Sequence, residues 1–426
     1  MKITAKTPFY HVYPLGLCGA PAHNHQGQPV PRLRQLASWI PHWRELGIGG
    51  LYLGPVFESH SHGYDTTDFS RIDPRLGSQA DLQLLARQLA DAGISLVLDG
   101  VFHHVGRGFF AFADVLAHGK ASVYCDWFEL DFETRSPLGD RFAYACWEGH
   151  QSLVKLNLAN PALRTYLFEA ISQWITLYQI RGLRLDVAYA LPKDFLRALA
   201  AHCRSLDPDF WLLGEVIHGD YQGWLGPDLL DAVTNYECFK GLWSSHRDHN
   251  YFEIAWSLNR LFGPEGNCQH QALYNFADNH DVDRVASQVA NPGQLYPLYQ
   301  LLYTMPGLPS IYYGSEVAIT GQRTPQDDTV LRPALPWDTF AAHLPHPLTR
   351  HLRQLAALRA ELPVLAQGDY RQVLVASEQF GFARSLGDSS CLSLVNMRDQ
   401  PVKVCLQDLP HPGHYRDLLN PGQTFE

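Results

Sequence analysis

Short apolar runs alternate with longer amphipathic ones along most of the chain. The apolar runs have the length of buried strands, whereas the segments between them repeat apolar residues every three or four positions, as helices do. An alternation of eight strands and helices predicts a closed parallel barrel of the (β/α)8 type, the TIM barrel, in the α/β class. The expected strands are Phe9–Tyr13, Gly50–Leu53, Ser95–Asp99, Gly182–Asp186, Phe210–Glu215, Asp231–Asn235, Ala272–Phe276 and Ser310–Tyr313.

The segments between and after these strands predict the helices. They are Leu33–Leu46, Gln79–Ala92, Asn160–Tyr178, Leu191–Ser205, Tyr251–Phe262, Leu295–Met305 and a final helix Pro347–Glu361.

Two stretches break the alternation. Residues from about 106 to 155 are irregular and rich in aromatic side chains, which predicts a small subdomain inserted after the third strand. The runs RQVLVAS, FGFARS, CLSLVNM and VKVCLQ alternate with period two, which predicts an antiparallel β-domain at the C-terminus. We therefore expect a barrel of residues 1–105 and 156–362, an inserted subdomain of residues 106–155, and a C-terminal β-sandwich domain of residues 363–426.

Composition and charge narrow the classes of partner. The formal net charge of −10 argues against nucleic acid or an anionic membrane. The first residues, MKITAKTPFYHVYPLG, lack the apolar stretch of a signal peptide, and no apolar run is long enough to cross a bilayer. The eight cysteines form no CxxC pair, so we expect free thiols. These features predict a soluble, cytoplasmic protein.

Charged side chains gather where the predicted strands end. In the strand Gly182–Asp186, Arg184 and Asp186 are two residues apart and share one face, while Leu183 and Leu185 fill the other. Further clusters end other strands or follow them closely: Asp99 to His104, Gly214-Glu215 and Asn279-His280-Asp281. In a β/α barrel the carboxyl ends of the strands form one rim, which is where such enzymes carry out their chemistry. An Arg–Asp pair that only closes a strand is the structural alternative.

Two of these carboxylates are suited to different roles in catalysis. Asp186, beside Arg184, is expected to stay charged and attack, whereas Glu215, which lies between apolar residues, is more easily kept protonated. This arrangement is that of a retaining glycosidase, whose two carboxyl groups lie about 5–5.5 Å apart.

Two other classes of protein fit part of the pattern. A metal-dependent hydrolase would use His60 and His62 with His103, His104 and Asp281 as ligands, but it would leave Asp186 and Glu215 without a role. A carbohydrate-binding protein without activity would be expected to lack one of the carboxylates at 186, 215 and 281, and all three are present.

The motifs together resemble those of the alpha-amylase family, glycoside hydrolase family thirteen, and within it the neopullulanase and cyclomaltodextrinase branch. The similar segments are Asp99–His104, Gly182–Asp186, Gly214-Glu215, Asn279–Asp281, GYDTTDF at Gly63–Phe69, LVKLN at Leu153–Asn157 and GLPSIYYGSE at Gly307–Glu316. The lysine of LVKLN favours the neopullulanase side over the α-1,6-glucosidase side.

The resemblance implies a role for each matching residue. Asp186 would be the nucleophile, Glu215 the general acid/base and Asp281 the third carboxylate, which braces the sugar hydroxyls. The residues implied in substrate binding are Tyr64, Asp99, His104, Arg184, His280, Asp328 and Arg332. The substrate would be an α-1,4-linked glucan, either a maltodextrin or a small cyclic glucan. Transglycosylation, or α-1,6 or exo action, is the alternative within the family.

Three departures from the family pattern bear on specificity and cofactors. His103 replaces the asparagine that can ligate a structural calcium, so we expect no calcium there and no required cofactor. Ala190 and Ile217 replace residues that shape the acceptor side of the cleft in relatives. The first strand begins by about Phe9, which leaves no room for the N-terminal domain through which such relatives dimerise, so a monomer is expected.

Overall fold

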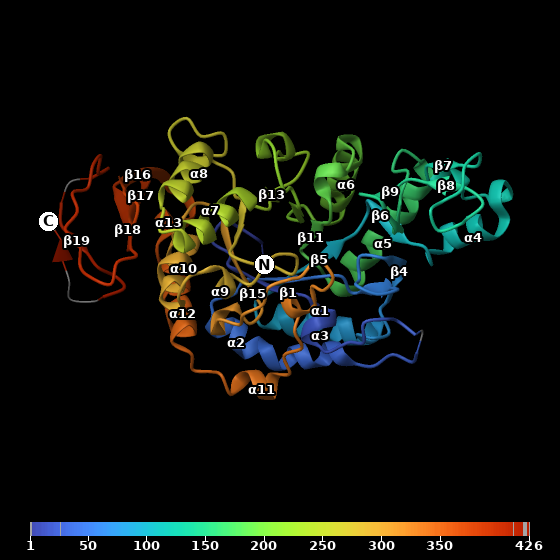
Figure 1. Cartoon of the computed structure of the whole chain (residues 1–426), viewed down its shortest axis with the longest axis horizontal. Helices are drawn as coiled ribbons and strands as arrows, with labels where there is room; N and C mark the ends of the chain where they lie inside the picture. The colour runs from blue at the N-terminus through green and yellow to red at the C-terminus, as the bar shows by residue number, and fades with distance from the viewer. Residues whose placement is uncertain (1, 26, 412, 421–423, 426) are drawn as a thin grey trace.

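A closed barrel of eight parallel strands forms the centre of the molecule (Figure 1). The computed structural model describes residues 2–25, 27–411, 413–420 and 424–425. Neighbouring strands follow the order β13-β12-β11-β5-β2-β1-β15-β14. A parallel bridge from Thr234 to Tyr274 joins the two ends of this order, so the sheet closes. The prediction of a (β/α)8 barrel is confirmed. The strands are β1 Phe9–Val12, β2 Gly50–Leu53, β5 Ser95–Gly100, β11 Gly182–Leu185, β12 Trp211–Gly214, β13 Ala232–Val233, β14 Tyr274–Phe276 and β15 Leu308–Tyr312.

Side chains fill the inside of the barrel. Phe9 stacks on Trp211 with ring centroids 5.1 Å apart, and Tyr274 meets Phe9 edge-on at 5.4 Å. These rings belong to a buried apolar cluster that also contains Val97 and Leu308. Because the barrel interior is packed, a substrate can be bound only beyond the strand ends.

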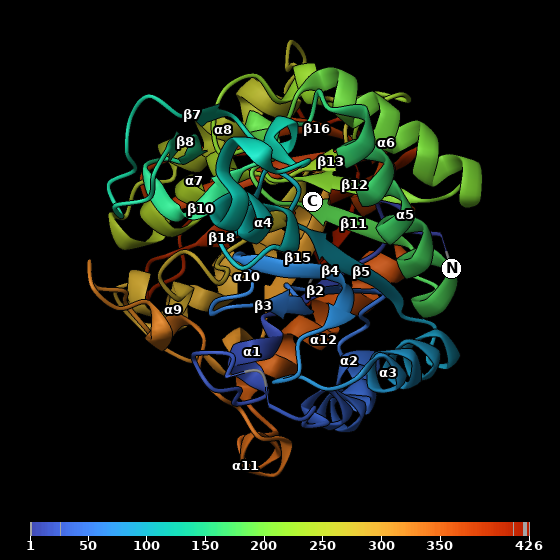
Figure 2. The same cartoon turned by 90° about the vertical axis from the view of Figure 1, so that its right-hand side faces the viewer.

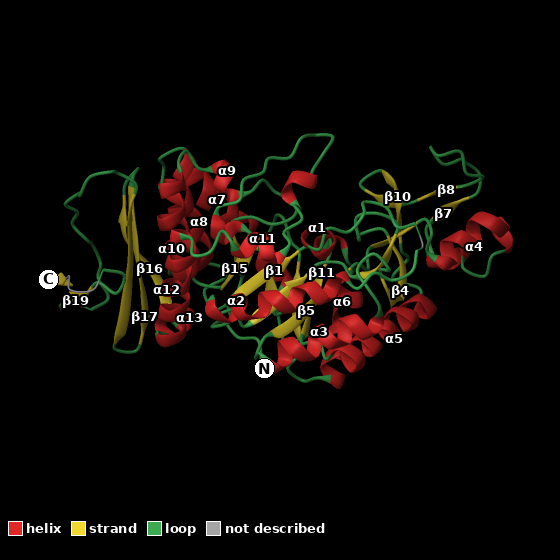
Figure 3. Ribbon diagram, turned by 90° about the horizontal axis from the view of Figure 1, so that it is seen from below, coloured by secondary structure: helices red, strands yellow, loops and turns green. Residues whose placement is uncertain are grey.

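Helices surround the barrel, as the amphipathic segments predict (Figure 3). They are α3 Gln79–Asp91, α5 Pro161–Tyr178, α6 Lys193–Leu206, α7 Tyr236–Arg247, α8 Phe252–Phe262, α10 Leu295–Thr304 and α12 Pro347–Glu361. Among the described residues, no helix combines the length and the apolar character needed to cross a bilayer.

One helix prediction needs correction, and one helix was missed. The segment predicted as one helix, Leu33–Leu46, is a 3-10 helix η1 at Arg32–Trp39 followed by a short α-helix α2 at Ile40–Glu45. Pro41 lies in the first turn of α2 and has no N–H to donate, so an α-helical ladder cannot run through it. Helix α7 was not predicted. It begins where the Asn235 side chain accepts a hydrogen bond from Cys238 N.

The inserted segment forms a lobe at one end of the long axis (Figure 1), and this end faces the viewer in Figure 2. Strand β10, His150–Lys155, pairs antiparallel with both β6, His104–Gly106, and β9, Cys146–Trp147. The lobe also holds α4 Phe110–His118, β7 Leu130–Asp131 and β8 Ala143–Tyr144. A hairpin of β3 Phe57–Ser59 and β4 Thr66–Ile72 carries the GYDTTDF motif to the same side.

The C-terminal part lies at the opposite end of the long axis (Figure 1). After α13 Pro363–Gln367, strands β16 Asp369–Val375, β17 Gln379–Leu386 and β18 Ser389–Asn396 form an antiparallel sheet, and β19 Tyr415–Arg416 pairs with β20 Thr424–Phe425. The prediction of a strand at VKVCLQ is wrong. Residues 402–407 are mostly exposed and form no strand, because their alternation has no packed face to bury. Residues 412, 421–423 and 426 of the predicted domain 363–426 lie outside the described residues.

Candidate active site

The barrel order places three buried carboxyl groups on neighbouring strands. Strand β11 lies between β5 and β12, and Arg184 is in register with Asp99 on one side and Leu213 on the other. Asp186 directly follows β11, and Glu215 directly follows β12. The side chains predicted from separate motifs therefore meet at one rim.

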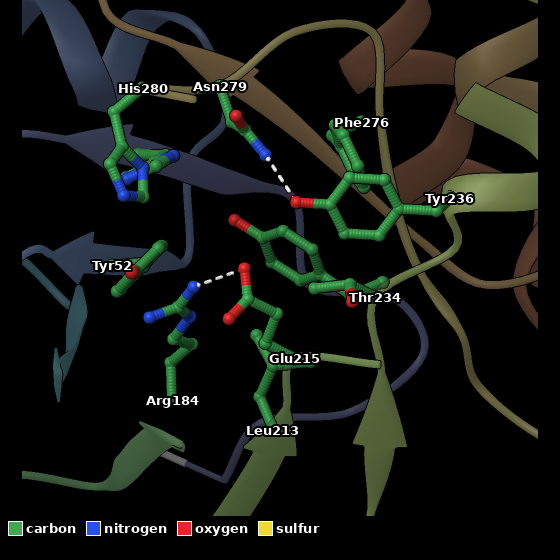
Figure 4. A pocket seen from close by; sticks show the side chains of 11 residues that line it. Tyr52, Arg184, Leu213, Glu215, Thr234, Tyr236, Phe276, Asn279 and His280 are labelled. Atoms are coloured by element: carbon green, nitrogen blue, oxygen red, sulfur yellow. Dashed lines mark hydrogen bonds and ion pairs between the residues drawn. The ribbon is translucent and has the colours of Figure 1, made fainter. Parts of the chain in front are cut away.

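Arg184 contacts all three carboxyl groups. Its Nη1 donates to Asp99 Oδ1 at 3.0 Å and to Asp186 Oδ1 at 2.8 Å, and its Nη2 lies 2.8 Å from Glu215 Oε1. Figure 4 shows the guanidinium and the Glu215 carboxyl facing each other in the lining of a small pocket. Asp186 and Glu215 thus lie on either side of one guanidinium group, near each other and fixed in orientation.

A left-handed turn follows Asp186 and fixes Glu215 further. Val187 has φ 50° and ψ 37°, a conformation that a β-branched residue rarely adopts. The turn directs Val187 N toward Glu215 Oε2, which it reaches at 2.9 Å. Backbone strain of this kind costs about 1–3 kcal/mol and gathers at functional sites. Here the strained turn at Val187 fixes the position of Glu215 Oε2.

Burial raises the pKa of both Asp186 and Glu215, and the positive charge of Arg184 opposes that rise at each. The pKa of Asp186 lies well above its ordinary value, partly because of the negative charge of Glu215. Burial also raises the pKa of Asp99, against the effect of Arg184 and of hydrogen bonds from Tyr52 and Tyr64. Both pKa values are shifted in the same direction, so burial alone does not separate a charged Asp186 from a protonated Glu215, and the two carboxyls share the charge of a single arginine.

Asp281 lies across the rim and is more open. Its side chain is 40% exposed, compared with 8% for Asp186 and Glu215. Arg332 Nη2 contacts Asp281 Oδ1 at 3.0 Å and Asp328 Oδ2 at 2.9 Å. The sequence-predicted pair Asp328 and Arg332 is thus tied directly to the third carboxylate and is not an isolated surface ion pair.

Two neutral imidazoles line the space between these groups. His280 Nε2 lies 3.0 Å from Asp281 Oδ2 and is also hydrogen-bonded to the Tyr64 hydroxyl. His104 Nε2 lies 3.9 Å from Asp186 Oδ2. Burial lowers the pKa of His104 to about 3 and that of His280 well below its ordinary value. Both rings therefore act as neutral hydrogen-bonding groups, as recognition of an uncharged polyol requires.

Tyr64, which the family resemblance implies in substrate binding, is largely covered by other residues of the site. The side chain is 9% exposed and stacks on the His280 ring, with centroids 5.4 Å apart and planes 8° apart. Its hydroxyl also donates to Asp99 Oδ2 at 3.1 Å. In the free protein Tyr64 therefore supports Asp99 and His280.

Three tyrosines of the site were not predicted. Tyr52 donates to Asp99 Oδ2 at 2.7 Å, Tyr13 stacks on His280 at 5.7 Å, and Tyr236 accepts a hydrogen bond from Asn279 Nδ2 at 3.3 Å. Tyr13 ends the first predicted strand and Tyr52 is the last residue but one of the second, so their position close to strand ends was the signal that could have identified them.

The histidines proposed as metal ligands do not converge. His62 Nδ1 accepts from Tyr64 N, and the His60 ring lies 5.8 Å from the ring of His23. Among the described residues, no three His, Cys, Asp or Glu side chains come together in a group that could hold a metal ion. His103 contacts His104 at 3.2 Å, and burial together with the Lys155 charge lowers its pKa to about 4. A nitrogen ligand near an ammonium group does not fit calcium, which prefers several oxygens.

Comparisons with known proteins agree with this geometry. The model of the alpha-amylase catalytic domain matches residues 24–340. A cyclomaltodextrinase of Geobacillus thermopakistaniensis (strain MAS1) is 31% identical over 93% of this chain, and neopullulanase 2 of Thermoactinomyces vulgaris is 32% identical over 89%. The chain spans 70% and 65% of the lengths of these two relatives.

The fold also matches a solved structure. A cyclic α-maltosyl-(1→6)-maltose hydrolase from Arthrobacter globiformis, in complex with that sugar, superposes with a TM-score of 0.82 at 27% identity, over 93% of this chain and 92% of that one. Because the family model covers most of the barrel and the relatives align over nearly the whole chain, the protein belongs to the alpha-amylase family, on its neopullulanase and cyclomaltodextrinase branch.

Proposed function

We propose that the protein hydrolyses α-1,4 bonds of maltodextrins or small cyclic glucans with retention of anomeric configuration. The observation that carries this proposal is the placement of Asp186 and Glu215 against the same guanidinium, with Asp281 across the rim. Retention requires two carboxyl groups on either side of one glycosidic bond. The names of the relatives, a cyclomaltodextrinase and a neopullulanase, support the choice of substrate class.

Asp186 and Glu215 act in both steps of the proposed reaction. Asp186 attacks the anomeric carbon while Glu215 gives its proton to the departing oxygen, so the bond to the leaving sugar breaks as a glycosyl ester forms. Glu215, now ionised, takes a proton from water, which attacks the same anomeric carbon, breaks its bond to the Asp186 oxygen and releases the carboxylate. The proposed reaction requires the proton on Glu215 and the negative charge on Asp186 when the substrate is bound.

The remaining residues bind and orient the sugar. Asp281, braced by Arg332, would accept hydrogen bonds from ring hydroxyls as positive charge develops at the anomeric carbon. His104 and His280 would contact hydroxyls of the sugar that becomes attached to Asp186, and Asp99 would hold Arg184 and Tyr64 in place. Asp328 would contact the next sugar unit with Arg332.

The stereochemical outcome tests the reaction type. Proton NMR during cleavage of maltotriose should show the α-anomer of the newly formed reducing end first, followed by mutarotation to the β-anomer. First appearance of the β-anomer would exclude a covalent intermediate on Asp186. Chromatography of the products from maltoheptaose, cyclodextrin and pullulan would then distinguish hydrolysis of α-1,4 bonds from transglycosylation or α-1,6 action.

We further propose that catalysis needs no calcium and no cofactor. His103 stands where the family pattern has an asparagine that can ligate the ion, and its imidazole, near the Lys155 charge, supplies no oxygen ligand. Activity and the thermal unfolding midpoint should therefore be unchanged in excess EGTA. A fall in the midpoint that added calcium reverses would show an ion site formed by other oxygens.

The cellular setting and organisation are also proposals. All eight cysteines are free, and four of them, Cys18, Cys203, Cys238 and Cys268, are buried thiols, which suits the reducing cytoplasm. We propose that the chain acts as a monomer, which sedimentation velocity can test. The separate sheets of the lobe and of the C-terminal part support folding units at 106–155 and 363–426 beside the barrel of 1–105 and 156–362.

A further inference from the structure

A side-chain bridge joins the inserted lobe to the barrel rim next to Asp186. The hydroxyl of Tyr189 donates to Glu148 Oε1 at 3.1 Å. Tyr189 lies in the 3-10 helix η4, Ala188–Ala190, which follows the left-handed turn at Val187. Glu148 lies in the turn between β9 and β10. Two segments that are far apart in the sequence thus meet above the strand that carries Asp186.

The bridge lies on the side of the cleft where the leaving group must depart. Tyr189 N donates to Glu215 O at 3.3 Å, so the tyrosine is fixed to the residue proposed to protonate the departing oxygen. On the lobe side, the ring of Trp147 lies 6.0 Å from the ring of His104. The bridge therefore spans the rim from the neighbourhood of His104 to that of Glu215.

The barrel order places the opposite subsite far from this bridge. Asp328 and Arg332 follow β15, which is four strands away from β11 in either direction around the closed sheet. A sugar chain that passes from Arg332 across Asp186 and Glu215 must continue toward Tyr189 and Glu148.

The turn that presents Glu148 is unusual for this residue. Glu148 and Gly149 both have positive φ, 45° and 87°, and they connect the paired residues Trp147 and His150. Two-residue hairpin turns of this kind favour glycine, asparagine or aspartate because the left-handed conformation is strained for other residues. A glutamate here has no advantage for the backbone, whereas its longer side chain reaches Tyr189.

The chemistry of the two partners suits a persistent contact. Burial raises the pKa of Tyr189 to about 12, so its hydroxyl keeps the proton that it donates. Glu148 is exposed and Tyr189 is half-buried, so the bridge is accessible to solvent. Ala190, beside it, is exposed and carries no polar group that could take its place.

We propose that the Tyr189–Glu148 bridge is a specificity determinant that limits the length of the leaving group. With the bridge closed, the space beyond the cleaved bond is limited, and a long leaving group requires the hydrogen bond to break. The inference rests on the proposed function and deepens it, because it assigns a preference to the acceptor side of the same cleft.

The test measures the leaving group directly. Maltoheptaose labelled at its reducing end keeps the label in the leaving group, so chromatography of labelled products at early times gives the leaving-group lengths. The two test variants are Tyr189→Phe, which keeps the ring, and Glu148→Asn, which suits the turn. In each, the ratio of labelled products longer than maltose to labelled glucose and maltose should rise about fivefold. This is the factor that one ordinary hydrogen bond represents.

Controls separate this role from a structural one. Glu148→Asn should leave the thermal unfolding midpoint unchanged or raise it, since asparagine tolerates the left-handed conformation. Glu133→Asn, which removes an exposed glutamate elsewhere in the lobe, should leave the product lengths as in the wild type. Unchanged product lengths in both bridge variants would overturn the inference while the hydrolase remained. Failure of the wild type to cleave the labelled sugar would overturn the proposed function together with it.

Discussion

Replacing Asp186 by asparagine is expected to lower kcat on maltooligosaccharides by at least about 10⁴-fold while the fold stays intact. An amide oxygen can still accept the hydrogen bond from Arg184 Nη1, but it cannot attack the anomeric carbon as an anion. The substitution also removes one of the three buried carboxyls that compete for Arg184, so stability should be retained or increased. Steady-state kinetics and the thermal unfolding midpoint of the same preparation measure both effects.

A matched variant shows whether the loss is specific to the rim. Asp228→Asn removes an exposed carboxylate that pairs with Arg197 on the outer helix α6, and it should leave kcat unchanged. Near-normal turnover of Asp186→Asn would mean that another group attacks the sugar, and the assignment of the nucleophile would be wrong.

The barrel could be predicted from the sequence because each of its strands is buried on both faces. Such strands appear as short continuous apolar runs, and their carboxyl ends share one rim by the geometry of parallel sheets. The positions of Asp99, Asp186 and Glu215 on that rim followed from this rule alone. The run at residues 402–407 shows the limit of predicting strands from apolar patterns, since alternating apolar residues form a strand only where a neighbouring surface covers one face.

The electrostatics of the site could not be predicted in the same way. The sequence pairs Arg184 with Asp186, which lies two residues away, but the contacts of Arg184 with Asp99 and Glu215 depend on which strands are neighbours in the closed sheet. Once three carboxyls share one guanidinium, their pKa values are set by the group and not by the apolar residues next to each. Contacts between neighbouring strands that are distant in the sequence, such as Tyr52 of β2 with Asp99 of β5, leave no local mark in the sequence.

Glu215→Gln is expected to lower kcat/KM for maltooligosaccharides by about 10²–10⁴-fold, the usual contribution of a general acid, with a far smaller loss for α-maltosyl fluoride. A sugar alkoxide needs a proton to leave, whereas fluoride departs without one, so the second substrate bypasses the missing acid. Glutamine can keep the contacts of Glu215 with Val187 N through its oxygen, which limits structural damage. The measurement is the loss in kcat/KM from wild type to variant on maltooligosaccharides, divided by the same loss on the fluoride.

Because Asp186 still attacks in the variant, the fluoride should also form the glycosyl ester faster than water removes it. An equal loss on both substrates would mean that Glu215 positions the sugar or Arg184 and does not transfer the proton.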